Sequence, residues 1–482
     1  MRKPRRLLRE EITSVAKNRE VNVLHRLGYP DQEAQFFSLL DSKRSWIQAI
    51  VAHLLNLSSK NACQVAEIEE WTHGSFDVCV PVTDFRPGNG DEKIRCEAGA
   101  YAWLEGTYPD IPIPRLYGFA MATGETRRSS PPGLSPFLLD FLAATLEPSH
   151  STCFRPPVPS KYIRHQSRME VPGCGRLEAG YVLLEYVEDT KGKMLSSTWA
   201  SKRDDVKLRA NLFRDISKIY LNNDGFLSLK NRPLSLGIQD LENERIAIDR
   251  PRDYTYSTVD SFVVDTLSYH DNRLISQPNA INDLSDYIYQ TSSLTTMRAI
   301  FSLFFSRELR RGPFIYSLTD LHPSNIFVDD NWHITSLVDL EWACSLPIEM
   351  VQPPHWFTDM AVDCIVHHQY NEMRLEFMSA LTAKEELDRS RGSGDSPAPL
   401  KLSHIMALSS PTGLFAIFDK MLQPRFTNKC SDHDAFHEIM PWYWAQDIVA
   451  ASTRKLADKR AYDIQLRREF EDEDCSTNLN SR

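Results

Sequence analysis

The stretch LTDLHPSNIFVDDNWHITSLVDLE, residues 318–341, holds the pattern from which the architecture can be inferred. Residues 325–329 and 334–338 are two short β runs, and the four residues between them are typical of a hairpin loop. Because Asn325 and Asp339 each lie seven residues from position 332, the hairpin should place them side by side at its open end. Asp320 precedes Asn325 by five residues, on the loop that enters the first strand. The stretch therefore predicts a carboxylate, a carboxamide and a second carboxylate close together.

These three side chains suit phosphoryl transfer. Magnesium prefers hard oxygen ligands and takes one or two protein carboxylates together with substrate phosphates, so Asn325 and Asp339 are candidate metal ligands. Asp320 is a candidate base, which would accept the proton of an attacking hydroxyl and orient it. An ordinary hairpin with acidic turn residues is the simpler interpretation. The spacings of five and fourteen residues between the three groups favour a catalytic site instead.

The composition is that of a globular protein. The chain has 482 residues, of which 42% are hydrophobic and 25% charged, and this excludes a mainly disordered, collagen-like or disulfide-scaffold protein. The net charge of −10 argues against a basic nucleic-acid-binding surface. No apolar run approaches the roughly 18 residues of a membrane span. The nine cysteines show no CxxC spacing, so we expect reduced thiols in a cytoplasmic protein with neither a nucleic-acid nor a membrane partner.

The first part of the chain is predicted to contain helices followed by a small sheet. Apolar residues at helical spacing predict two helices within residues 31–57, and alternation predicts a strand over 76–82. We expect a helix from about 91 to 104 and a further strand over 181–187. The arginine, serine and proline content of residues 125–165 is typical of a partly disordered surface insertion.

The second part is predicted to be mainly helical. Helices are expected over 208–220, over 294–305 and again from about 358, whereas 386–400 resemble a loop. We therefore divide the chain into an N-terminal helical extension (1–62), a β-rich lobe (63–187), a helical lobe (188–465) that holds the hairpin segment 315–341, and an acidic flexible tail (466–482). This predicts the α+β fold class, with the layout of a protein-kinase-like bilobal fold.

Several segments resemble one known family. DLHPSNIFVD (320–329) and LVDLEWA (337–343) are similar to the catalytic segment of the aminoglycoside phosphotransferase/choline kinase family, and to its large fungal subset in particular. WTHGSF (71–76), IPIPRLYG (111–118) and LLEY (183–186) are similar to segments of its N-terminal lobe. The resemblance covers most of residues 63–450. It implies a kinase-like fold, ATP and Mg²⁺ as cofactors, and a hydroxyl or amine acceptor.

The resemblance also implies roles for individual residues. By position it makes Asp320 the base and Asn325 and Asp339 the metal ligands, with Glu341 a candidate supporter of the metal or substrate. The nucleotide-binding residues that it implies are those of a phosphate loop, a helix glutamate and a hinge that contacts adenine through backbone groups, namely Gly74, Ser75, Glu97, Glu185, Tyr186 and Val187.

The sequence departs from the family at two places. Leu318 stands where the family usually has a histidine, two residues before the base. The other departure is more serious, because only eight residues separate Val82 from Asp91. A strand, a turn and the cation that holds the α- and β-phosphates need roughly twice that length. We therefore expect this strand to be missing, and Glu97 to be exposed or to borrow Arg86 or Lys93.

The missing strand leaves three interpretations open. The protein is an active phosphotransferase with a small-molecule acceptor, a catalytically impaired pseudokinase-like binding protein, or the product of a deduced sequence that lacks an exon. The acceptor is open as well. The net charge of −10 gives a weak preference for a cationic acceptor, since such long-range attraction is screened beyond about 8 Å at physiological salt.

Overall fold

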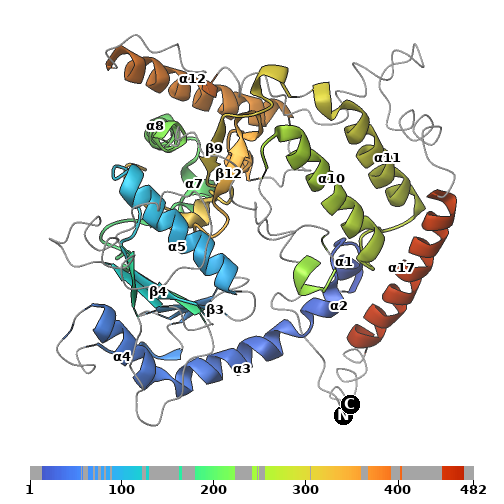
Figure 1. Cartoon of the computed structure of the whole chain (residues 1–482), viewed down its shortest axis with the longest axis horizontal. Coiled ribbons are helices and arrows are strands. Elements are labelled where there is room, and N and C mark those ends of the chain that lie inside the picture. Colours follow the sequence, from blue (N-terminus) through green and yellow to red (C-terminus); the bar gives the residue numbers. More distant parts are fainter. Residues whose placement is uncertain are drawn as a thin grey trace, which may run out of the picture.

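The structure is a computed structural model of the whole chain. The residues it describes are 13–55, 57, 63–68, 71–73, 78–80, 83–86, 90–121, 126–129, 162–165, 180–222, 241–246, 248, 256–303, 305–359, 367–391, 402–403 and 448–471. Figure 1 shows helices arranged around small sheets. All strand pairs among these residues are antiparallel. The chain is therefore a mixed helix and sheet protein, in agreement with the predicted α+β class.

The largest sheet has seven strands in the order β1-β2-β3-β7-β4-β5-β6. Their bounds are Thr72–His73 (β1), Val78–Val80 (β2), Thr83–Arg86 (β3), Leu116–Ala120 (β4), Thr126–Ser129 (β5), Tyr162–His165 (β6) and Gly180–Leu184 (β7). Strands β5 and β6 are the two ends of the predicted insertion, and they extend the sheet beyond β4. Residues 130–161 lie outside the described residues.

The strand that the sequence analysis expected to be missing is present. Strand β3 pairs with β2 through Val78 and Phe85, and with β7 through Asp84 and Val182. Arg86 is its last residue and pairs with Gly180. The prediction is therefore wrong, because a chain that reverses directly after β2 needs only a few residues to form a short antiparallel strand.

Helices cover both faces of this sheet. Along β7, Val182 packs into the core that contains α5 (Gly90–Thr107), whereas Tyr181 and Leu183 pack into a separate cluster with α4 (Arg44–Leu54). Phe119 and Ala120 of β4 divide between the two clusters in the same way. This alternation is expected of a strand buried on both faces. The predicted helix over 91–104 is confirmed as α5.

The N-terminal helices connect the seven-stranded sheet with α17, a helix near the end of the sequence. They are α1 (Thr13–Lys17), α2 (Val23–Arg26), α3 (Tyr29–Ser42) and α4, and the two helices predicted within 31–57 are confirmed as α3 and α4. Ala16 and Val23 form a buried cluster with Tyr462 and Leu466 of α17 (Ile448–Glu471). Figure 1 shows α3 connecting α4, beside the sheet, with α2 near α17.

The second half of the chain is mainly helical, as predicted. Its elements are β8 (Lys193–Met194), η3 (Leu195–Ser197), α7 (Trp199–Lys202), α8 (Val206–Asn222), α10 (Val259–Ser276), α11 (Leu284–Ile300), η4 (Phe301–Leu303), η5 (Arg307–Leu309), β9 (Phe314–Ser317), η6 (Pro323–Asn325), β10 (Ile326–Val328), β11 (Ile334–Leu337), β12 (Cys344–Pro347), η7 (Ile348–Met350), η8 (His355–Thr358), α12 (His367–Arg391) and α17. The predicted loop over 386–400 is wrong for 386–391, which continue α12, and 392–400 lie outside the described residues. Among the described helices, none is long and apolar enough to cross a membrane.

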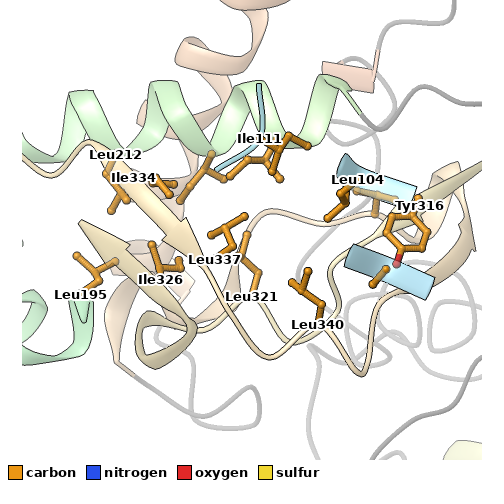
Figure 2. Packing of buried hydrophobic residues seen from close by; sticks show 14 of the residues in the cluster. Leu104, Ile111, Leu195, Leu212, Tyr316, Leu321, Ile326, Ile334, Leu337 and Leu340 are labelled. Carbon is orange, nitrogen blue, oxygen red and sulfur yellow. The ribbon is translucent and has the colours of Figure 1, made fainter. Parts of the chain in front are cut away.

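The predicted hairpin is confirmed as β10 and β11, and it is held in the main core. Figure 2 shows Ile326, Ile334 and Leu337 of the hairpin close to Leu195 of η3 and Leu212 of α8, and all five are buried. The backbone N–H of Leu337 donates to the carbonyl of Pro112 at 2.9 Å, which joins the end of β11 to the segment that links α5 and β4. The apolar side of the hairpin thus packs between η3 and α8, and this packing also fixes the position of its open end.

Candidate functional site

The hairpin register brings Asn325 and Asp339 to the same end. Ile326 pairs with Leu337, and one residue further out the backbone N–H of Val338 donates to the carbonyl of Asn325 at 3.0 Å. Asp339 follows directly, with a left-handed φ of 58°. Positive φ is uncommon outside glycine, although aspartate adopts it more readily than most residues. This backbone conformation turns the chain sharply after Val338 and keeps Asp339 at the open end of the hairpin.

Asp320 and Asn325 are in direct contact. The Asn325 Nδ2 atom donates to the backbone carbonyl of Asp320 at 3.0 Å and to its carboxylate Oδ2 at 3.3 Å. The loop is also tied to itself, because the N–H of His322 donates to the Asp320 carbonyl at 2.8 Å. The Oδ1 atom of Asn325 accepts from Ser324 Oγ at 3.4 Å, and its second lone pair can still act as a metal ligand.

Both acidic residues belong to the lining of one pocket. Asp320 and Asp339 both line it, together with Leu318, Leu321, Val338, Leu340 and Ala343. The apolar lining comes from residues on either side of the two acids in sequence. Leu318 is the residue that stands in place of the histidine implied by the family resemblance, and here it supplies part of this lining. The structure therefore brings together all three groups that the sequence predicted to converge.

Burial changes the acidity of Asp320. Although Asp320 as a whole is exposed, the surrounding protein removes part of the water from its carboxyl group, and this desolvation raises its pKa. His322, the hydrogen bond from Asn325 and His355 act in the opposite direction. A general base works best when its pKa lies near the working pH. The raised pKa therefore suits a carboxylate that accepts a proton.

The two candidate ligand oxygens suit a magnesium ion. Asn325 Oδ1 and the Asp339 carboxylate are both hard oxygen ligands, and Mg²⁺ usually keeps several waters or phosphate oxygens besides one or two protein ligands. The described part of the chain contains no group of three or more His, Cys, Asp or Glu residues placed to hold a metal ion. A site of one carboxylate and one carboxamide does not require such a group. Glu341, the candidate supporter, is buried with 3% of its surface exposed.

The hinge residues lie at the end of β7, apart in sequence from this pocket. The backbone N–H of Glu185 donates to the Arg115 carbonyl at 2.9 Å, and the Glu185 carboxylate accepts from Arg115 N at 3.3 Å and from Lys191 Nζ at 2.6 Å. The hydrogen bond from Lys191 is the main cause that lowers the pKa of Glu185. The side chain of Glu185 thus fixes the start of β4. Tyr186 is 70% exposed.

The phosphate-binding part of the predicted site is described only in part. Glu97 lies on α5 and is buried, with 1% of its surface exposed, which excludes the first of its two predicted alternatives, exposure to solvent. The reason is that α5 packs closely against the sheet, with Ile94, Ala98 and Tyr101 in the core. Gly74 and Ser75 lie outside the described residues. The side chains of Arg86 and Lys93 are not described either, so the borrowed cation stays a prediction.

The sequence analysis missed one residue beside Asp320. His355 begins η8, and the next residue, Trp356, donates from its indole Nε1 to the carbonyl of Leu321. Leu321 lies between Asp320 and His322, so this bond brings the segment that begins with His355 to the loop that carries Asp320. No spacing in the sequence could indicate this contact. The only local signal is Pro353-Pro354 before it, which predicts an extended and rigid approach.

Comparisons of the chain with protein-family models, with curated proteins and with solved structures give no match. The resemblance noted in the sequence therefore stays a prediction. The functional argument rests on the geometry of the pocket.

Proposed function

We propose that the protein is an ATP- and Mg²⁺-dependent phosphotransferase with a kinase-like fold, acting on a hydroxyl or amine of a small-molecule acceptor. The observation that carries this proposal is the convergence of Asp320, Asn325 and Asp339. Asp320 and Asp339 line one pocket, and Asn325 donates to Asp320. The layout of a seven-stranded sheet followed by a mainly helical part supports the kinase-like fold.

In this proposal each residue has one task. Bound magnesium would neutralise charge on the phosphates of ATP, and Asn325 Oδ1 and the Asp339 carboxylate would hold it. Asp320 would accept the proton of the acceptor and orient the attacking atom towards the phosphate. The hydrogen bond from Asn325 Nδ2 to the carboxylate helps to keep the Asp320 side chain from turning away. Positioning of this kind accounts for much of the catalysis of phosphoryl transfer.

The pseudokinase-like alternative loses part of the reason for which it was considered. It depended on a missing strand and on the phosphate-binding cation of that strand, and β3 occupies the place of the strand in the sheet. Arg86 at the end of β3 is a candidate for the phosphate-binding cation by its position on the strand next to β7. The same finding removes the reason to suspect a missing exon. We therefore favour the active enzyme.

The test is ATP turnover with Mg²⁺ across hydroxylated and amino acceptors, for the wild type and for Asp320→Asn. Removal of a general base should lower kcat by roughly 10²–10⁴-fold. Asp330→Asn is the matched control, because it makes the same change at an exposed residue at the other end of the hairpin. Equal rates for the wild type and Asp320→Asn would overturn the assignment of Asp320 as the base.

A further inference from the structure

The pocket that Asp320 and Asp339 line is formed by two segments of the chain. Residues 318, 320 and 321 belong to the first segment, and residues 338–340 and 343 to the second. The first segment directly follows β9, and the second leads directly into β12. These two strands pair with each other, and the last pair of their ladder is Ser317 with Cys344. Beyond this pair the two segments line the pocket, and each of them carries one of the two acidic residues.

A side-chain hydrogen bond joins the two segments beyond the end of the ladder. Thr319 donates from its Oγ1 atom to the carbonyl of Trp342 at 2.6 Å, a distance typical of a well-formed O–H···O bond. Thr319 directly precedes Asp320, and Trp342 follows Asp339 by three residues. The bond therefore restrains the distance between the two segments directly beside Asp320.

The carbonyl that accepts this bond belongs to a buried residue. Trp342 has 7% of its surface exposed, and it packs against Ile248 and against Tyr269 of α10. Thr319, in contrast, is exposed. Because burial does not hold Thr319 in place, its hydrogen bond to the fixed carbonyl is what restrains the backbone next to Asp320.

We propose that Thr319 is a positioning residue, which holds Asp320 at the correct distance and angle from the phosphate bound on the Asp339 side of the pocket. This inference rests on the proposed phosphotransferase function. In the transfer, the acceptor hydroxyl gives its proton to the Asp320 carboxylate, and its oxygen forms a bond to the γ-phosphorus of ATP. The bond from that phosphorus to the β–γ bridging oxygen breaks, and ADP leaves.

The transfer depends on the relative position of the two segments. Asp339 belongs to the segment that would hold the nucleotide, whereas Asp320 belongs to the segment that would hold the attacking atom. A misplacement of about 1 Å can lower the rate of such a reaction by about 10²-fold. Asn325 restrains the Asp320 carboxylate itself, but the bond from Thr319 links the Asp320 segment to the one that follows Asp339. Its loss should therefore affect the chemical step more than nucleotide binding.

The experiment measures the release of ADP from Mg-ATP, with water alone and with added glycerol or ethanolamine as acceptor probes. It compares the wild type with Thr319→Val, which keeps the branched shape but lacks the hydroxyl, and with Thr319→Ser, which keeps the hydroxyl. We expect Thr319→Val to lower kcat by about tenfold or more, with the KM for ATP changed by less than about twofold. Thr319→Ser should recover most of the lost kcat.

The matched control is Thr382→Val on α12, where the threonine hydroxyl donates to the carbonyl of Met378 at 2.9 Å. Each valine variant loses one hydroxyl-to-carbonyl bond, so both should show a similar fall in melting temperature, about 2 °C. Only Thr319→Val should lose kcat, because a merely structural role would affect both variants alike.

Three results would overturn the inference and leave the nucleotide site intact. They are an unchanged kcat in Thr319→Val, an equal loss of kcat in Thr382→Val, and no release of ADP by a wild type that Mg-ATP still stabilises. Absence of both ADP release and stabilisation by Mg-ATP would overturn the proposed function, and this inference with it.

Discussion

Replacement of Asn325 by aspartate tests whether the hairpin carries a metal site or is an ordinary hairpin with acidic turn residues. The change keeps an oxygen that can bind Mg²⁺ but removes the two hydrogen bonds to Asp320, at 3.0 and 3.3 Å. It also places a second carboxylate beside Asp320. Without metal the variant should be less stable than the wild type. With metal, the extra negative charge should strengthen binding, so the two proteins should become more alike.

The magnitude follows from the distances. Two lost hydrogen bonds are worth about 1–3 kcal/mol together. Two charges held at 3.3 Å would repel by about 5 kcal/mol at an effective dielectric constant of 20. Because Asp320 is exposed, solvent and side-chain movement should reduce this repulsion to about 1 kcal/mol. We therefore expect the free energy of unfolding of Asn325→Asp to fall by about 2–4 kcal/mol without metal.

The assay is urea unfolding with and without millimolar MgCl₂, with ionic strength matched by NaCl. Magnesium should remove about half of the deficit or more. Asn371→Asp is the control, since Asn371 lies on α12 and its Oδ1 only accepts from Arg374. It should show little change and no magnesium dependence. A deficit in Asn325→Asp that is the same with and without Mg²⁺ would refute the assignment of Asn325 and its neighbours to a metal site.

Three further predictions test the fold, one at the hairpin and two at α17. Gly192→Ala would place a Cβ 2.2 Å from Thr335 Oγ1, so urea unfolding should show a loss of about 1–3 kcal/mol. No loss would mean that Gly192, the residue before β8, approaches the hairpin less closely than in the structure. Burial lowers the pKa of Lys455 to about 8, below the roughly 10.5 of an unfolded lysine. The unfolded state therefore binds more protons between these values, and unfolding at several pH values should show wild-type stability rising over that window by up to about 3 kcal/mol relative to Lys455→Met; parallel curves would contradict this. In Tyr462→Phe the N–H of Leu24 loses the hydroxyl to which it donates at 3.2 Å. Amide hydrogen exchange should therefore become faster in α1 and α2 than in the wild type, but not in α8. The same change in exchange rate in both regions would contradict a localised contact.

The hairpin and its three polar groups could be predicted because every cue is local. Two apolar runs, one turn and fixed spacings lie within residues 318–341, and the open end of a hairpin is determined by counting from its turn. The helix α5 could be predicted for a similar reason. Ile94, Ala98, Tyr101 and Leu104 recur at helical spacing, and all four are buried.

Strand β3 could not be predicted because its partner is distant in sequence. It has only four residues, and two of them, Asp84 and Arg86, are charged. Its partner β7 follows α5 and β4 in sequence, so that Asp84 pairs with Val182. The glycines and proline after Arg86 also indicated a turn. The end of α12 was missed for a comparable reason. Its last residues are charged and precede Gly392, but Lys384 and Asp388 form an i,i+4 ion pair that continues the helix.

The position of His355 beside Asp320 depends on tertiary structure alone. It lies thirty-five residues beyond Asp320 in sequence, and the contact is made by the indole of Trp356 and the carbonyl of Leu321. A backbone carbonyl is present at every residue, so the sequence carries no sign of which one a tryptophan will bind. Residues that lie beside a motif without belonging to it are found only from the fold.

The account is tested most directly by the change in melting temperature that Mg-ATP causes in the wild type and in Asp339→Asn. Asparagine tolerates the left-handed backbone of Asp339, so this variant should keep the fold and lose only the charge. We predict that Mg-ATP raises the melting temperature of the wild type and of Asp330→Asn by several degrees, and that most of this rise is lost in Asp339→Asn. An equal rise in all three proteins, or no rise in the wild type, would contradict a magnesium–nucleotide site at Asp320, Asn325 and Asp339.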